Sequence, residues 1–122
     1  MAELFVDDRV RHTKRLIRPV LDAGGIVLCD RYMMSTCAYQ WSQGVGLSSL
    51  IELHKDRGLL TPDITFLIQI TQETAKARIN ERGDALEKFE KDKHFITKLI
   101  NAYATLGHMA RVDENIFGKV TM

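Results

Sequence analysis

The spacing of hydrophobic and polar residues predicts an α/β fold. Apolar residues recur every three to four positions, as in amphipathic helices, over three segments: about 3–23, 47–57 and 86–106. A fourth helix, over about 72–81, is expected from its start signals, the N-cap Thr71 and Glu73 in the first turn. Short and nearly continuous apolar runs, which are typical of buried parallel strands, occupy three others: about 26–29, 64–70 and 117–122. Because helices separate the strands, we expect parallel pairing with right-handed crossovers.

Local signals predict where the helices begin, bend and end. Pro19 lies inside the first helix and should kink it or loosen its last turns, and Gly24-Gly25 should end it. Ser48 or Ser49 could cap the helix over 47–57, and Thr71 is a good N-cap for the helix over 72–81. A shorter helix is expected over 35–41, and a polar loop over 111–115.

Two apolar stripes run along the predicted helices, and the second should face the core. The first lies along the first helix: Phe5, Val6, Val10, Leu16, Ile17, Val20 and Leu21. The second lies along the last helix: Leu86, Phe89, Phe95, Ile96, Leu99, Ile100, Tyr103 and Leu106. With no strand before the first helix, part of its broad apolar face should stay exposed.

Composition excludes several classes of function. The 122 residues suit one domain, and a net charge of +1 provides no basic field for nucleic acid. No apolar run approaches the roughly 20 residues that cross a membrane. Cys29 and Cys37 lack disulfide-framework spacing, so we expect reduced thiols in the cytoplasm. The four histidines are scattered singly, and no metal site is expected from them.

The candidate site begins where the first strand ends. Asp30-Arg31-Tyr32 follows the run 26–29, and ligands of open α/β sheets bind at the carboxyl ends of strands. Hydroxyls, a phenol and an amide follow within ten residues: Ser35, Thr36, Tyr39 and Gln40. This density indicates a recognition site. The alternative is an N-capped helix in which Asp30 and Arg31 form a structural ion pair.

Two further pairs can be interpreted structurally or functionally. Phe5 and Arg9 are four residues apart on one helix face. Phe5 could be a core side chain and Arg9 a solvated surface residue. Alternatively, the Phe5 ring could stack on a base while the Arg9 guanidinium holds a phosphate. Arg78 and Arg82 could complement the C-terminal dipole of their helix. They could equally be guanidiniums on a flap that closes over phosphates.

The order of these motifs resembles the thymidylate kinase family, P-loop enzymes that phosphorylate dTMP to dTDP with ATP. Phe5 to Arg9 is similar to its F-x-x-x-R helix, and Asp30 to Gln40 to its D-R-Y/H-x-x-S-T/N-x-A-Y/F element. Leu60 to Leu67 is similar to its P-D-L-T strand entry, and Arg78 to Glu90 to its arginine-bearing lid. The resemblance implies one truncated three-layer domain over 1–122, with a lid at about 78–90, and with Mg²⁺ and ATP as cofactors. Because members of the family pair through helices of the 3–23 region, it also implies a homodimer.

The resemblance also implies a role for each candidate residue. Phe5 would stack on thymine, and Arg9 and Arg31 would hold the dTMP phosphate. Asp30 would orient Arg31 and a magnesium-bound water. Thr36 and Gln40 would contact the base edge, and Tyr39 the sugar. Arg78 and Arg82 would neutralise charge on the ATP phosphates and on the transferring phosphoryl group.

This sequence departs from the family pattern in the lid and in the ATP loop. Asn80 stands where the family often has a third arginine, and Glu87-Lys88 where Asp-Arg is common. No G-x-x-x-x-G-K-S/T segment occurs in the 122 residues. We therefore expect a truncated chain that retains the dTMP-facing residues and has negligible kinase activity alone. The alternatives are a non-catalytic nucleotide- or partner-binding relative, or a kinase for another nucleoside monophosphate.

Overall fold

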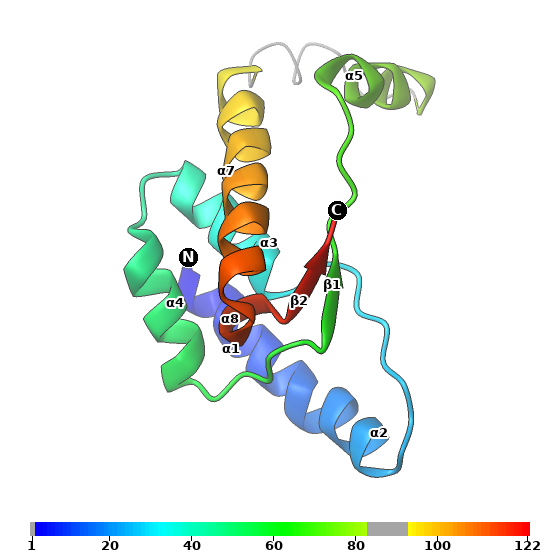
Figure 1. The fold of residues 1–122 in the computed structure, drawn as a ribbon, viewed down its shortest axis with the longest axis vertical. Coiled ribbons are helices and arrows are strands. Elements are labelled where there is room, and N and C mark those ends of the chain that lie inside the picture. Colours follow the sequence, from blue (N-terminus) through cyan, green and yellow to red (C-terminus); the bar gives the residue numbers. More distant parts are fainter. Residues whose placement is uncertain (1, 83–92) are drawn as a thin grey trace.

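The computed structural model describes residues 2–82 and 93–122, and within them the fold is α/β with mostly helices (Figure 1). The first half holds α1 (Ala2–His12), the π-helical turn η1 (Thr13–Ile17), α2 (Arg18–Asp22), α3 (Met33–Ser42) and α4 (Leu47–Asp56). The second half holds β1 (Ile64–Phe66), α5 (Gln72–Glu81), α7 (Lys93–Val112), α8 (Glu114–Phe117) and β2 (Lys119–Thr121).

The structure confirms the predicted helices over 47–57 and 72–81 as α4 and α5. Thr71 caps α5 as expected, because its side chain accepts a hydrogen bond from the Thr74 amide at 3.1 Å. The predicted cap of α4 is wrong: Gly46 is the N-cap residue and no side chain caps the helix. Glycine supplies the extended backbone that this position needs, without a side-chain acceptor.

Pro19 shapes the first helix without ending it. Helical structure runs from α1 through η1 into α2, as predicted for 3–23. In the π-helical turn, the Arg18 amide bonds to the Thr13 carbonyl, five residues back. Proline has no N–H and its ring crowds the preceding turn, which accounts for a wider turn immediately before it. The helix therefore changes type immediately before Pro19.

Only two of the three predicted strands form a sheet. β1 and β2 pair in parallel, with Ile64 opposite Lys119 and Phe66 opposite Thr121. The predicted strand over 26–29 is wrong: Ile26 and Leu28 are 88% and 92% exposed, and no strand among the described residues pairs with them. A strand completes its backbone hydrogen bonds only with a neighbouring strand, so an apolar run alone does not form one.

Two element boundaries differ from the prediction at the ends of the sheet. The strand pairing of β1 covers three residues of the predicted 64–70. The predicted loop over 111–115 instead contains the end of α7 and the start of α8, where Asp113 caps the helix by accepting from the Asn115 amide at 3.0 Å. Phe117 closes α8, and the predicted strand over 117–122 is shortened to β2.

The core lies between α1, α3, α4 and α7. Its largest fully buried side chains are Val6, Cys37, Leu50 and Leu106. Leu99 and Tyr103 of α7 lie against this core, which confirms that part of the second stripe; Leu86 and Phe89 fall outside the described residues. A Cβ on Gly107 would lie 2.8 Å from the Leu67 side chain, so glycine lets α7 approach the end of β1 closely.

The first helical stripe is only partly covered. Val6 and Ile17 are buried, as predicted for its core-facing side. Leu4, Phe5, Leu16 and Leu21 are exposed, which confirms the expectation of apolar surface along this helix. None of the helices in the described residues is both long and apolar enough to cross a membrane.

Candidate functional site

Arg9 is the centre of the polar cluster. It projects from α1, and its Nε donates to the Thr36 hydroxyl of α3 at 2.9 Å. Its Nη1 donates to the backbone carbonyl of Arg31 at 3.3 Å. Burial lowers the pKa of the Arg9 guanidinium below its usual value, although arginine stays protonated in proteins. These two bonds fix a half-buried positive charge beside the start of α3.

Arg31 adopts a strained backbone conformation in the connection before α3. Its φ of 62° lies in the left-handed region, and it is the only non-glycine residue there in the described chain. This conformation costs roughly 1–2 kcal/mol for a residue with a Cβ, so surrounding contacts must maintain it. Its carbonyl accepts from Arg9, and its guanidinium lies 5.6 Å from the centroid of the Tyr39 ring.

Tyr32 completes the surroundings of Arg9. The Arg9 guanidinium lies 5.6 Å from the centroid of the Tyr32 ring, which favours a cation there. The Tyr32 hydroxyl is 3.5 Å from the Thr13 hydroxyl, at the limit of a hydrogen bond. Burial is the main cause that raises the pKa of Tyr32, so this phenol remains neutral at physiological pH.

Sequence reasoning missed the role of Tyr103. It belongs to the apolar stripe of α7 and was predicted as core, but its hydroxyl lies 2.8 Å from the Ser35 hydroxyl of α3. Burial raises the pKa of Tyr103, while the Ser35 hydrogen bond and the charges of Arg31 and Arg9 lower it. A tyrosine in an apolar stripe carries a polar tip, and this was the available signal.

The other predicted binding residues lie on the same two helices. Phe5 is one turn before Arg9 on α1 and is exposed. Gln40 is buried on α3, one turn beyond Thr36, whose side chain is also buried. Asp30 is exposed, and no ion pair joins it to Arg31 in the described part of the chain. The structural ion pair that was one interpretation of these two residues is therefore absent there.

The two lid arginines are not part of this cluster. Arg78 lies in the last turn of α5 and Arg82 is its C-cap, with the Arg82 Nε donating to the Arg78 carbonyl at 3.4 Å. Figure 1 shows α5 apart from α1 and α3. Residues 83–90 of the predicted lid fall outside the described residues. The structure thus brings together Arg9, Arg31, Thr36 and Tyr39, and leaves Arg78 and Arg82 elsewhere.

The cluster has the chemistry of an oxyanion site. Two guanidiniums lie along α3 (Met33–Ser42), that of Arg9 beside Thr36 in its first turn and that of Arg31 over the Tyr39 ring. The first amides and the dipole of this ten-residue helix also favour an anion. Within residues 2–82 and 93–122, no three acidic, histidine or cysteine side chains group as metal ligands would. These residues also form no phosphate-binding loop of the G-x-x-x-x-G-K-S/T type. They therefore fit a phosphate-bearing ligand, but they do not fit ATP with its magnesium.

Comparison with known proteins places these features in one family. A thymidylate kinase family model matches residues 1–116. A thymidylate kinase of Brachyspira hyodysenteriae is 35% identical over 112 residues, which cover 90% of this chain and 54% of that protein. A thymidylate kinase of Desulfotalea psychrophila is 42% identical over 90 residues, covering 73% and 44%. A probable thymidylate kinase of Thermococcus kodakarensis is 39% identical over 108 residues, covering 88% and 51%. The chain thus spans about half the length of these curated relatives.

Proposed function

This chain belongs to the thymidylate kinase family, and we propose that its Arg9–Arg31 cluster binds the phosphate of dTMP. The proposed activity is that of a nucleotide kinase, which transfers a phosphoryl group from ATP to dTMP with Mg²⁺ and forms dTDP. The proposed fold is that of the three-layer P-loop kinase domain. The chain itself contributes the side that receives the phosphoryl group.

The geometry of Arg9 is the observation that carries this proposal. A guanidinium has five N–H donors, and Arg9 uses one at Nε and one at Nη1 for Thr36 and Arg31. Three donors remain for an oxyanion, on a group whose direction these two bonds already fix. Charge-assisted bonds from a pre-positioned fork suit a phosphate dianion, and they lose little side-chain entropy on binding.

The neighbouring residues support a nucleoside attached to that phosphate. Phe5 provides an exposed ring one helical turn from Arg9, where it can stack on thymine. Thr36 and Gln40 place a hydroxyl and an amide on α3 for the base edge. Tyr39, whose ring lies under the Arg31 guanidinium, would contact the sugar. Asp30 would hold Arg31 in position when the ligand is bound.

The ATP side of the reaction rests on the family alone. Arg78 and Arg82 are proposed to neutralise ATP phosphate charge from a lid that closes over the site. Phosphoryl transfer depends almost entirely on positioning and electrostatic stabilisation, and the described residues do not cradle ATP. We therefore expect the 122-residue chain alone to have negligible kinase activity. Ordinary turnover in a coupled assay with dTMP, ATP and Mg²⁺ would contradict this.

Calorimetric titration of the chain with dTMP and with thymidine tests the binding proposal. If Arg9 and Arg31 hold the phosphate, dTMP binds roughly ten- to a hundredfold more tightly than thymidine, as charge-assisted hydrogen bonds predict. Equal affinities would show that the guanidiniums do not hold a phosphate. Tighter binding of dCMP or dAMP than of dTMP would instead favour a kinase for another nucleoside monophosphate.

A homodimer in the cytoplasm is the proposed setting. The exposed apolar side chains on the first helix, Leu4, Leu16 and Leu21, offer a surface that a second copy could cover. Cys29 and Cys37 are both free, which is compatible with a reducing compartment. Light scattering of the purified chain tests the dimer, and a monomeric mass at all accessible concentrations would exclude it.

A further inference from the structure

A hydrogen bond joins the start of α3 to the long helix α7. The Tyr103 hydroxyl of α7 lies 2.8 Å from the Ser35 hydroxyl of α3, and either group can donate to the other. Ser35 is buried, and Tyr103 packs against the hydrophobic core. The two residues are 68 positions apart in the sequence. The bond therefore fixes one point of α3 against a helix that the core already holds.

Ser35 is the neighbour of Thr36, the residue whose hydroxyl accepts from Arg9. Both belong to the first turn of α3, where their amides bond to the Tyr32 carbonyl at 3.1 and 3.4 Å. No side chain caps this end of the helix. Just before it, Arg31 has the left-handed φ of 62°. Because helix ends without caps fray, the position of the Thr36 hydroxyl depends on the other contacts of this turn.

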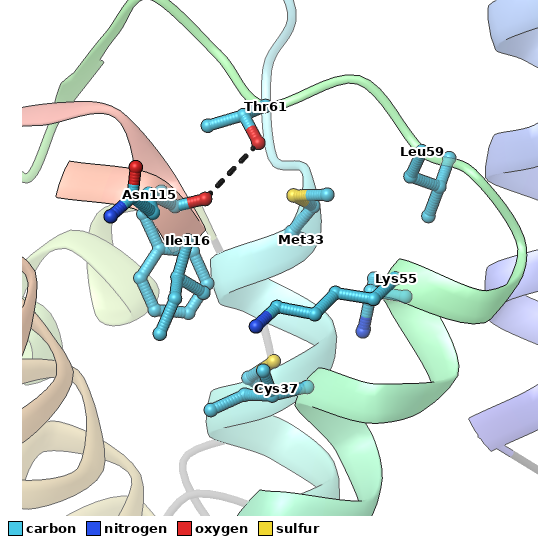
Figure 2. Close-up of a pocket in the computed structure, with 10 residues that line it drawn as sticks. Met33, Cys37, Lys55, Leu59, Thr61, Asn115 and Ile116 are labelled. Carbon is cyan, nitrogen blue, oxygen red and sulfur yellow. Dashed lines mark hydrogen bonds between the residues drawn. The ribbon is translucent and has the colours of Figure 1, made fainter. Parts of the chain in front are cut away.

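Apolar side chains hold the side of α3 that faces away from Ser35. Met33 and Cys37, each two residues from Ser35, lie on that side of the helix and are buried. They line a small cavity between α3, α4 and α8, and Figure 2 shows their side chains beside it. The cavity has about 30 Å³ of space, enough for one or two waters, so packing here is incomplete. Apolar burial is also non-directional, whereas the hydrogen bond between Ser35 and Tyr103 fixes a direction.

The Tyr103 hydroxyl lies within the electrostatic field of both guanidiniums. Burial is the main cause that raises the pKa of Tyr103, and the charges of Arg31 and Arg9 lower it in part. The phenol therefore stays neutral at physiological pH and keeps its hydrogen bond to Ser35. Among residues 2–82 and 93–122, no hydrogen bond joins Tyr103 to either arginine. Any effect of its hydroxyl on the direction of Arg9 therefore passes through α3.

We propose that Tyr103 is a positioning residue for Arg9. Its bond to Ser35 holds the first turn of α3 where Thr36 accepts from the Arg9 Nε, and so directs the guanidinium towards the ligand. This inference rests on the phosphate-binding function proposed above, but Arg9 in the ligand-free chain tests it separately. The alternative is a tyrosine whose hydroxyl only supports the fold, with no effect on Arg9.

The ligand-free test follows the Arg9 Nε–H signal by nuclear magnetic resonance. Tyr103→Phe removes the hydroxyl and keeps the ring, and the Arg9 Nε–H should then exchange with water roughly two- to tenfold faster, as the loss of one net hydrogen bond predicts. Thr105→Ala is the matched control, because it removes an exposed hydroxyl of α7 that bonds to the Asn101 carbonyl of the same helix. This variant should leave Arg9 exchange unchanged. Unchanged exchange in Tyr103→Phe would overturn the proposal.

Calorimetric titration of Tyr103→Phe with dTMP and with thymidine tests the consequence for binding. The dTMP affinity should fall roughly two- to tenfold, whereas the thymidine affinity should stay the same, because thymidine has no phosphate for Arg9 to hold. Equal losses for both ligands would mean that the hydroxyl only supports the fold, and the proposal would be wrong. If the unsubstituted chain does not prefer dTMP to thymidine, the proposed function fails, while Arg9 exchange still decides the role of Tyr103.

Ser35→Ala tests the route by which Tyr103 acts. It breaks the same hydrogen bond from the other side, so it should accelerate Arg9 Nε–H exchange as Tyr103→Phe does. The double variant should exchange no faster than either single variant, because there is one bond to lose. Additive effects would show that Tyr103 acts by another route and would contradict the proposal. Should Tyr103→Phe fail to fold, Ser35→Ala alone decides: unchanged Arg9 exchange in that variant would overturn the proposal.

Discussion

The helical part of the molecule, α1, α3, α4 and α7, and its extended part, residues 26–29 and 64–70, are both rich in apolar residues but bury them very differently. Val6, Leu50 and Leu106 of the helical part are fully buried. Leu28 and Ile68 of the extended part are 92% and 84% exposed. A helix forms its backbone hydrogen bonds internally, so it needs a neighbouring element only to bury its apolar side chains. A strand needs a neighbouring strand for its backbone hydrogen bonds as well as a packing partner for its side chains.

The same division separates the two halves of the proposed chemistry. Arg9 of α1 bonds to Thr36 of α3, and Tyr103 of α7 bonds to Ser35 of α3, so packed helices hold Arg9, the proposed phosphate-binding residue. Arg78 and Arg82 follow the extended part, on α5, where the Gln72 amide bonds to the Thr97 hydroxyl of α7 at 2.8 Å. We therefore expect dTMP binding to depend on the helical part alone.

Stability should show the largest difference between the two parts. Leu106→Ala empties a fully buried position of α7 and should lower the free energy of unfolding by about 2–5 kcal/mol. Leu28→Ala, at a 92% exposed position, should change it by less than about 0.5 kcal/mol. Urea denaturation of both variants measures the difference. Similar losses would show that residues 26–29 are buried in solution, and the comparison would fail.

Ligand binding should follow the same division. Arg9→Gln removes the charge held by Thr36 and Arg31, and it should weaken dTMP binding roughly ten- to a hundredfold. Arg78→Gln on α5 should leave dTMP affinity unchanged in the absence of ATP. Calorimetric titration of both variants tests this. A loss in Arg78→Gln as large as that in Arg9→Gln would place the phosphate beside α5.

Acid should destabilise the helical part through His54. Burial lowers the pKa of His54 below its usual value of 6.5, although the Leu50 hydrogen bond raises it in part. As the pH falls, His54 is therefore protonated in the unfolded chain at a higher pH than in the folded chain. Stability from His54 is complete above about pH 6.5 and declines below it, by at most about 1.4 kcal/mol per pH unit.

Urea denaturation between pH 7.5 and 5 measures this slope, and two substitutions assign it. His54→Phe should flatten the pH dependence, whereas His108→Gln at an exposed position should not. If the slope survives in His54→Phe, another group causes it and the buried neutral state of His54 is disproved.

The smallest expected effect is confined to α5. Thr71→Ala removes the side chain that accepts from the Thr74 amide, and caps of this kind contribute about 1 kcal/mol. Amide exchange within α5 should become faster, while exchange of the core amides of α7 stays unchanged. Slower folding or faster exchange throughout the chain would mean that α5 and the helical part unfold as one unit.

Sequence patterns predict best those elements whose start and end are marked by local residues such as helix caps. α5 has the predicted bounds because Thr71 caps it and Glu73 stands in its first turn, where an acidic side chain suits the helix dipole. The run 26–29 was misjudged because its apolar residues say nothing about whether a neighbouring strand exists, and pairing depends on that neighbour. Similarly, the π-helical turn before Pro19 depends on how the backbone relieves the clash with the proline ring. The spacing of apolar residues along the sequence does not show this.

The sequence predicts several residues of the candidate site, but it does not predict which of them contact one another. Asp30, Arg31 and the polar residues after them stand together in the sequence, so a recognition site could be expected. The bond from Arg9 to Thr36 joins residues 27 positions apart, and the left-handed backbone of Arg31 has no signature in its residue type. The apolar stripe predicts Tyr103 as core because the pattern reflects its hydrophobic ring and does not show where its hydroxyl points.

The most direct test of the central claim is a dTMP titration of the isotope-labelled chain, followed at the Nε–H signals of its arginines. The Arg9 Nε already donates to Thr36, and its signal should shift together with that of Arg31 as dTMP binds. The Arg78 signal should stay in place. Shifts of Arg9 and Arg31 that saturate with dTMP but not with thymidine are the predicted result. A titration that leaves both signals unchanged, or moves Arg78 alone, would contradict a monophosphate site between α1 and α3.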